Sequence, residues 1–167
     1  IPLRVFSAEG ELIGEFGEEK RAVVRIKDVP DVLKQAVLAA EDDRFYQHGG
    51  VDFSGVVRAA LANVQGRREG AGTITMQVAR TFFLTREKTI ARKLSEVLLA
   101  FKIEASLSKD QILELYLNQI FLGSRAYGFA SAAHVYFGKS LAEVTPAEAA
   151  MLAGITRAEP AFDPVLA

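Results

Sequence analysis

Apolar residues recur along most of the chain at the three- and four-residue spacing that is typical of amphipathic helices. Pro30 suits the first turn of a helix, and four apolar positions follow it at this spacing: Leu33, Ala36, Val37 and Ala40. Residues 3–26 differ, because "LRVFSAEGELIGEF" holds two apolar runs separated by Glu-Gly, which predicts a β-hairpin. We therefore expect a mostly α fold with a small N-terminal β element.

Three further helices carry apolar stripes that we expect to pack against the rest of the fold. The first begins at Asp52 or Ser54 and carries Val56, Ala60, Leu61 and Val64. The second spans about 86–106 and carries Ile90, Leu94, Val97, Leu98, Phe101 and Ala105. The third follows Ser108 and carries Ile112, Leu113, Tyr116, Leu117 and Ile120. Capping boxes are predicted at two helix starts, from Ser108 with Gln111 and from Thr145 with Glu148, where Pro146 takes the first helical position.

The composition of the 167 residues fits one globular domain, since half of them are hydrophobic. The formal net charge of −1 gives no global support for a nucleic-acid partner. The charge is uneven, however, because the segment from Arg58 to Lys102 has nine Lys or Arg and three Glu. A local excess of bases suggests a phosphate or a lipid headgroup as partner, although a solvated helix face gives the same pattern.

Some classes of site and segment are missing from the sequence. The absence of Cys excludes disulfides and Cys-based metal sites. No apolar run reaches the ~20 residues of a membrane span, and no signal peptide is visible. The chain starts at Ile1, and we expect both ends to have been cut from something longer.

The stretch "VLAAEDDRFYQHGGVD" ends a predicted helix in three acids, Glu41, Asp42 and Asp43. Acids are unfavourable at that end, because the helix dipole is negative there. Glu41 continues the apolar stripe, so desolvation and the neighbouring acids should disfavour its ionised form. Such a carboxyl group suits a general base or acid near neutral pH. The alternative is a solvent-exposed acidic turn.

Two other stretches combine cations with hydrogen-bond donors. In "ARKLSEVLLAFK", Arg92 and Lys93 are four and three residues before Glu96, as in a functional cluster or in ordinary surface ion pairs. In "EGAGTITMQVARTFFL", a glycine-rich turn precedes hydroxyl and amide donors that suit an anion: Thr73, Thr75 and Gln77. The Phe82-Phe83-Leu84 cluster that follows is flanked by cations, which suits a membrane interface or a buried helix edge. We expect the segment 65–84 to be mobile and membrane-seeking, above all its loop 65–72.

Five stretches occur in order along the chain: "EDDRFYQHGG", "GAGTITMQ", "RKLSE", "KDQILELYLN" and "RAYGFASAAHVYFGK". Together they resemble the five motifs of the peptidoglycan glycosyltransferases, the family 51 domain of class A penicillin-binding proteins. The resemblance runs from about Pro30 to Phe162. Five motifs in order at comparable spacing are far more specific than any one of them.

This resemblance implies a lysozyme-like, two-lobed fold, in which a large lobe and a small membrane-associated jaw flank an extended cleft. We expect residues 1–29 to form the N-terminal β or linker element and residues 30–167 the glycosyltransferase domain, with the jaw at about 60–90. The implied reaction polymerises lipid II into β-1,4 glycan strands. The 4-hydroxyl of lipid II attacks the anomeric carbon of a lipid-linked glycan, undecaprenyl pyrophosphate leaves, and the configuration inverts without a covalent intermediate.

The resemblance also implies roles for individual residues. Glu41 resembles the general base and Glu96 the second catalytic acid; the family is compatible with a divalent cation, Mg²⁺ or Mn²⁺, held by Glu96, and implies no organic cofactor. The implied substrate-binding residues are Asp42, Phe45, His48, Thr73, Gln77, Arg80, Arg92 and Lys93. The first three should shape the site, and the three cations should surround the leaving pyrophosphate. We expect the fourth and fifth motifs to support the fold. The sequence assigns no role to four of their residues: Asn118, Arg125, Gly128 and Lys139.

The implied location is the outer, periplasmic face of a bacterial inner membrane, with the anchor absent from this chain. The implied partners are lipid II, a lipid-linked glycan chain, the membrane surface and other cell-wall synthesis proteins, but no nucleic acid. The parent chain could carry a transpeptidase domain.

The second motif departs from the family pattern, which usually reads Gly-Ser-Thr-Ile-Thr-Gln-Gln. Gly72 replaces the serine and Met76 the first glutamine, so donor contacts of that loop are in doubt. Thr81 follows Arg80 where the family often has Asn.

Two rival functions remain open. A lysozyme-like hydrolase or lytic transglycosylase would share the fold, but it needs few cations for a pyrophosphate. A catalytically silent helical module that docks on a membrane or on proteins would not need Glu41 and Glu96.

Overall fold

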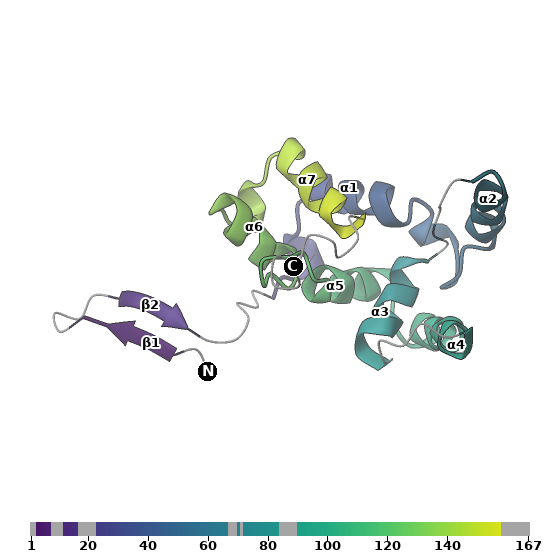
Figure 1. Ribbon diagram of the computed structural model, residues 1–167, viewed down its shortest axis with the longest axis horizontal. Coiled ribbons are helices and arrows are strands. Elements are labelled where there is room, and N and C mark those ends of the chain that lie inside the picture. Colours follow the sequence, from purple (N-terminus) through teal and green to yellow (C-terminus); the bar gives the residue numbers. More distant parts are fainter. Residues whose placement is uncertain are drawn as a thin grey trace.

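The computed structural model describes residues 3–7, 12–16, 23–66, 70, 72–83 and 90–157. Its helices are α1 (Asp31–Glu41), α2 (Phe53–Val64), α3 (Ile74–Phe83), α4 (Ile90–Ser106), α5 (Lys109–Gln119), α6 (Phe129–Phe137) and α7 (Pro146–Arg157). Short 3-10 turns lie at Ile26–Asp28, Phe45–Gln47 and Leu141–Glu143. The mostly α fold class is confirmed (Figure 1).

The N-terminal segment contains two antiparallel strands, β1 (Leu3–Phe6) and β2 (Leu12–Phe16). Leu3 pairs with Phe16, and the register shifts between Val5 and Phe6. These strands fall in the segment for which a hairpin is predicted, and they lie apart from the helices in Figure 1.

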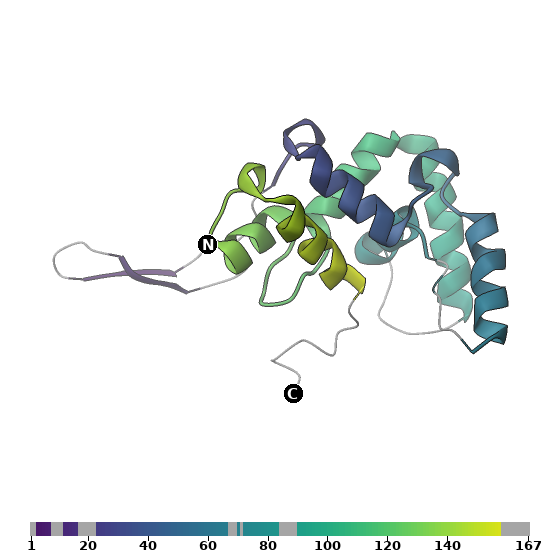
Figure 2. The same cartoon turned by 90° about the horizontal axis from the view of Figure 1, so that it is seen from above.

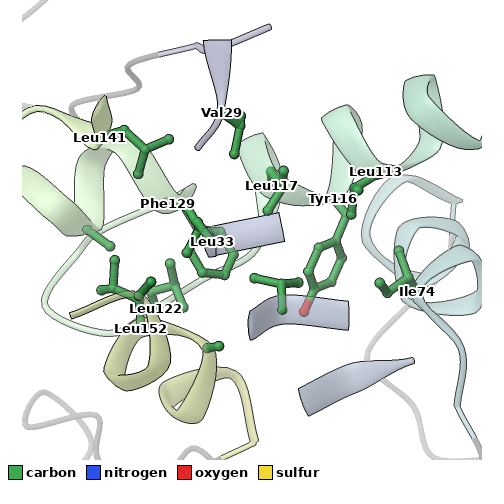
Figure 3. Close-up of a cluster of buried hydrophobic side chains, with 14 of the residues drawn as sticks. Val29, Leu33, Ile74, Leu113, Tyr116, Leu117, Leu122, Phe129, Leu141 and Leu152 are labelled. Atoms are coloured by element: carbon green, nitrogen blue, oxygen red, sulfur yellow. The ribbon is translucent and has the colours of Figure 1, made fainter. Parts of the chain in front are cut away.

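The main core is built around α5, whose apolar stripe is the one that the sequence predicts. Its residues Ile112, Leu113, Tyr116 and Leu117 are all buried. Figure 3 shows Leu113, Tyr116 and Leu117 in one buried cluster with side chains from four other helices: Leu33 of α1, Phe129 of α6, Leu152 of α7 and Ile74 of α3. Full burial of each such side chain stabilises the fold by about 1.5–3 kcal/mol.

Both predicted capping boxes are confirmed at helix starts. At α5, Ser108 accepts the Gln111 N–H, while the Gln111 side chain accepts the Ser108 N–H. At α7, Thr145 and Glu148 exchange the same pair of hydrogen bonds. Each box satisfies two backbone donors that the first helical turn leaves without partners.

The apolar stripes predicted for α2 and α4 do not face the core, which corrects the sequence interpretation. On α2, Val56, Ala60, Leu61 and Val64 are exposed, while Gly55, Ala59 and Ala62 are buried. On α4, Leu94, Leu98, Phe101 and Ala105 are exposed, while Glu96, Ala100 and Ile103 are buried. On α2 only small residues take the inner positions, and on α4 these are Glu96, Ala100 and Ile103, while most of the large apolar residues of the predicted stripes remain outside.

These two helices lie at the same end of the molecule, beside α3 (Figures 1 and 2). We call the exposed set of Val56, Val57, Leu61 and Val64 on α2 and Leu94, Leu98 and Phe101 on α4 the outer apolar face. Within the described residues, none of the helices is both long and apolar enough to cross a membrane.

Candidate active site

Glu41 is the last residue of α1, and side chains from two other helices hold its carboxylate. Gln77 of α3 donates from Nε2 to Glu41 Oε2 at 2.7 Å. Thr156 of α7 donates from its hydroxyl to Oε1. Because both oxygens of this partly buried group are engaged, the carboxylate has a defined orientation.

Asp42, the next residue, explains how an acid is tolerated at the end of α1. Its side chain is buried and accepts the N–H of Ile74, the first residue of α3, at 3.1 Å. The N-terminus of a helix carries partial positive charge, so the start of α3 offsets the unfavourable end of α1. Asp43, by contrast, is exposed.

His48 completes this connection between α1 and α3. Its Nε2 lies 2.9 and 3.0 Å from the two carboxylate oxygens of Asp42. The Gly50 N–H donates to Nδ1 at 3.2 Å, so the hydrogen-bond pattern assigns the proton to Nε2. Asp42 and His48 thus hold the end of α1 and the start of α3 together.

Two of the residues that the resemblance assigns to substrate binding have buried side chains. Phe45 is 1% exposed and belongs to the core. Thr73 is 2% exposed; its hydroxyl donates to the Gly50 carbonyl at 2.6 Å and accepts the Met76 N–H at 3.2 Å. Thr73 therefore caps α3 and has no free donor for a phosphate or a sugar.

Three cations surround Glu96 on α4, as the sequence predicts, and we call these three cations with Glu96 the cation cluster. Arg92 and Lys93 contact the carboxylate at 2.8 and 3.0 Å, and Arg80 reaches it from α3 at 2.9 Å. The Glu96 side chain is 0% exposed because these cations cover it, while Arg80 and Lys93 are 45% and 48% exposed. The gathering of these four residues at one place is confirmed.

The electrostatics of this cluster favour the ionised form of Glu96. Burial alone would raise the Glu96 pKa, but hydrogen bonds and charges from Arg80 and Lys93 outweigh it and hold the pKa below its usual value. Three cations around one carboxylate leave the cluster with an excess of positive charge. Such an excess is costly unless an anion binds beside it.

The same arrangement does not suit a divalent metal ion. Both carboxylate oxygens of Glu96 already contact cations, and the three cations would repel a metal ion bound beside them. The described part of the chain also contains no group of three His, Asp or Glu side chains placed to hold a metal. The residues present therefore do not fit the metal that the family resemblance suggested at Glu96.

Helix α3 connects Glu41 to the cation cluster. Gln77 contacts Glu41, and Arg80, three residues later, contacts Glu96. Residues three apart on a helix are neighbours, with about 5–6 Å between Cβ atoms. The two carboxylates are therefore held through successive turns of one helix, whose start is fixed by Asp42.

The departures in the second motif have little effect on these contacts. Met76 is 2% exposed and packs in a small cluster with Val51 and Ala100. Gly72 has open space around it, since an added Cβ would meet nothing within 4 Å. Thr81 is exposed and donates to the Gln77 carbonyl at 3.0 Å.

The predicted mobile segment 65–84 lies partly outside the described residues, which omit 67–69, 71 and 84–89. Phe82 is described and is 44% exposed, so its side chain is not core. The prediction of mobility stays a prediction.

Of the four residues that the sequence left open, Asn118, Gly128 and Lys139 serve the fold, and Arg125 is recorded by its backbone conformation. Asn118 pairs with both the N–H and the carbonyl of Val24, at 2.8 Å each. Lys139 contacts Glu148 at 2.7 Å. Arg125 has a φ of 58°, and Gly128 has a φ of 81° where a Cβ would lie 2.8 Å from the Asn118 carbonyl oxygen. Only glycine fits that last position without strain.

Sequence reasoning missed Thr156. It lies 115 residues after Glu41, outside the five motifs, and nothing in its local pattern marks it. Only the packing of α7 against α1 brings the two together.

The chain is similar in sequence to known proteins. The sequence model of the family described as Transglycosylase matches residues 9–167. Penicillin-binding protein 1A of Neisseria gonorrhoeae is 58% identical over 168 residues, covering 99% of this chain and 21% of its own length. Penicillin-binding protein 1A of Haemophilus influenzae is 52% identical over 166 residues, covering 98% and 20%.

The fold is also similar to a solved structure. The crystal structure of Penicillin-binding protein 1A from Haemophilus influenzae superposes with a TM-score of 0.50 and 30% identity, covering 100% of this chain and 16% of that one. The chain thus spans about a fifth of the length of the relatives it matches. A family match over nearly all its residues shows what it is: the chain belongs to the transglycosylase family, the family 51 peptidoglycan glycosyltransferase domain of class A penicillin-binding proteins.

Proposed function

We propose that this domain polymerises lipid II into β-1,4 glycan strands, with inversion and release of undecaprenyl pyrophosphate. The observation that carries the proposal is the pairing of a held carboxylate, Glu41, with a cluster of excess positive charge around Glu96, both attached to α3. The first suits an attacking hydroxyl, and the second suits a departing pyrophosphate.

In the proposed reaction Glu41 is the general base. The 4-hydroxyl of lipid II gives its proton to the Glu41 carboxylate while its oxygen forms the new bond to the anomeric carbon of the lipid-linked glycan. The bond from that carbon to the pyrophosphate oxygen breaks, and the electron pair leaves with the phosphate. A positioned base typically contributes about 10²–10⁴-fold in rate, and Gln77 holds one oxygen of the Glu41 carboxylate.

The cation cluster stabilises the leaving group. Negative charge on the pyrophosphate grows as the glycosidic bond breaks, so cations placed in advance favour the transition state over the ground state. Arg80 and Lys93 are about half exposed and can reach a bound phosphate. Glu96 keeps the three cations together before the substrate arrives, and no metal ion takes part in this scheme.

We also propose that the outer apolar face rests on the membrane that carries the substrate. Leu61 and Val64 on α2 are 61% and 88% exposed, and Leu94 on α4 is 61% exposed, at the same end of the molecule as the cation cluster. A lipid-linked substrate places its pyrophosphate at the membrane surface, and apolar residues next to cations suit that interface. The region corresponds to the expected jaw at about 60–90, together with α4.

The location and the parent protein follow as further proposals. The supporting comparison is with penicillin-binding protein 1A, of which this chain matches about a fifth. We propose a position on the outer face of a bacterial inner membrane and a parent chain with a transpeptidase domain and other cell-wall synthesis partners.

Incubation with lipid II tests the function. The parent protein should produce glycan polymer, and Glu41→Gln should abolish polymerisation with an unchanged melting curve. Asp43→Asn is the matched control, because Asp43 is an exposed acid two residues away and should keep parental activity. Activity of Glu41→Gln within a few-fold of the parent would exclude the general-base role. Cleavage of isolated cell-wall sacculi would support a hydrolase, and neither reaction would support a binding module.

A further inference from the structure

Thr156 reaches Glu41 from a third helix. It lies in the last turns of α7, which packs along α1. The Thr156 hydroxyl has two possible acceptors, Oε1 of Glu41 and the carbonyl oxygen of Ala153 at 2.7 Å. Nothing in the proposed reaction so far requires a hydroxyl at this position.

A hydroxyl group has one proton, so Thr156 can donate to only one of these acceptors at a time. An ionised carboxylate is the stronger acceptor, and Thr156 therefore donates to Glu41 while Glu41 is charged. When Glu41 takes up a proton, its carboxyl group becomes a weaker acceptor. The hydroxyl can then turn to the Ala153 carbonyl and keep a hydrogen bond.

The other polar groups near Glu41 come from α3, from the end of α1 and from α5. Gln77 from α3 is neutral, and Asp42 is occupied by His48 and by the start of α3. Tyr116 from α5 is buried, and burial followed by the negative charge of Glu41 raises its pKa far above the usual value, so it stays protonated. Figure 3 shows its ring crossing the core from α5, with the hydroxyl at the end away from that helix.

The Tyr116 hydroxyl lies beside Thr156, and a hydrogen bond between the two side chains acts on the Tyr116 pKa against the larger effect of burial. Thr156 is the residue whose hydroxyl donates to the Glu41 carboxylate. It also has a second acceptor within reach, the Ala153 carbonyl, so its hydrogen bond can respond to the charge of Glu41.

We propose that Thr156 is a positioning residue for the general base. Its hydroxyl holds Oε1 of Glu41 in place while the carboxylate is ionised, and turns to Ala153 when Glu41 accepts the proton of the attacking hydroxyl. This inference rests on the proposed function of Glu41, but the contact itself can be measured without turnover.

The test compares Thr156→Val, which keeps the branched shape and removes the hydroxyl, with Thr156→Ser, which keeps the hydroxyl. The Glu41 carboxyl is titrated by NMR in protein with ¹³C-labelled glutamate, assigned with Glu41→Gln. Loss of a hydrogen bond to the charged form should move the midpoint in Thr156→Val upward by about one pH unit. Thr156→Ser should restore most of the shift.

Steady-state kinetics on lipid II give the second readout. In Thr156→Val, kcat should fall by about tenfold because the carboxylate can rotate, while KM changes by less than about threefold. The acid limb of the pH–rate profile should move upward with the NMR midpoint, and Thr156→Ser should restore both.

An unchanged midpoint and an unchanged acid limb in Thr156→Val would overturn the inference. A loss of kcat without either shift, not restored by serine, would indicate a merely structural role and would also overturn it. If Thr156→Val melts too low to measure, Thr156→Ala is titrated instead. Polymerisation that survives in Glu41→Gln would refute the proposed function, whereas the NMR midpoint still tests the contact.

Discussion

Replacement of Lys93 by alanine separates two roles for the cation cluster. In a plain surface ion-pair row, Lys93 would only stabilise the fold. In a leaving-group site, it would mainly serve catalysis. The structure places its Nζ 3.0 Å from Glu96 Oε2 and leaves its side chain 48% exposed. These two facts set different magnitudes for the two roles.

The expected loss of stability is small. An ion pair whose lysine is half exposed is screened by water, so its removal costs about 0–1 kcal/mol of unfolding free energy. Glu96 keeps Arg80 and Arg92 as partners in the variant, and the buried carboxylate is not left unpaired. For a domain of this size, about 1 kcal/mol lowers Tm by about 2–4 °C.

The expected loss of activity is much larger. A charge-assisted contact to the leaving pyrophosphate contributes about 1.5–3 kcal/mol. If that contact forms mainly in the transition state, its loss lowers the rate by roughly 10–100-fold, since 1.36 kcal/mol corresponds to a factor of ten. Binding of an inhibitor that mimics the pyrophosphate should weaken in parallel.

Steady-state turnover of lipid II and thermal melting measure the two effects on the same samples. Lys102→Ala is the matched control, because Lys102 lies on the same helix, is exposed and is away from Glu96; both its kinetics and its melting should match the parent. Near-normal turnover in Lys93→Ala, or a rate loss equal to that of Lys102→Ala, would refute the assignment of Lys93 to the leaving group.

Three further predictions test other parts of the structure. Folding lowers the pKa of Glu96 from its usual 4.5, so the ionised carboxylate stabilises the native state above that pH. In urea unfolding, the stability advantage of the parent over Glu96→Gln should therefore shrink as the pH falls below 4.5. A difference in stability that does not change with pH would contradict this. Gly128→Ala should lower the free energy of unfolding by about 1–3 kcal/mol, because the φ of Gly128 is positive and a Cβ would lie 2.8 Å from a backbone oxygen. Gly154→Ala, inside α7 with open space around it, should be neutral or stabilising. Equal melting temperatures of the two variants would contradict the strain argument. Val57→Ser combined with Leu61→Ser should weaken binding to liposomes without lowering Tm, because these side chains are 60% and 61% exposed, and unchanged binding would exclude them as membrane contacts.

The sequence predicts best where the signal is local. The α5 stripe and the two capping boxes depend on residues three or four apart, and all are confirmed. The same spacing is misleading on α2 and α4, where large apolar residues such as Leu61 and Leu98 point outward. Periodicity identifies an apolar helix face but does not say whether protein or membrane covers it.

The candidate site follows the same division between local and distant contacts. Spacing on α4 predicts that Arg92 and Lys93 meet Glu96, but Arg80 comes from α3 and depends on packing. Thr73 matches a motif and is nevertheless buried, because the hydroxyl that would reach a ligand is used to cap α3. Thr156 matches no motif and contacts Glu41 directly.

The acids that end α1 follow from the position of α3. Asp42 fixes the first residue of α3, and that fixed start determines where Gln77 and Arg80 project one and two turns later. A change at Asp42 would therefore displace the contact to Glu41 and the contact to Glu96 together. An acid at the end of α1 is unfavourable for that helix. The buried Asp42 carboxylate nevertheless fixes the start of α3, and α3 carries the residues that contact Glu41 and Glu96.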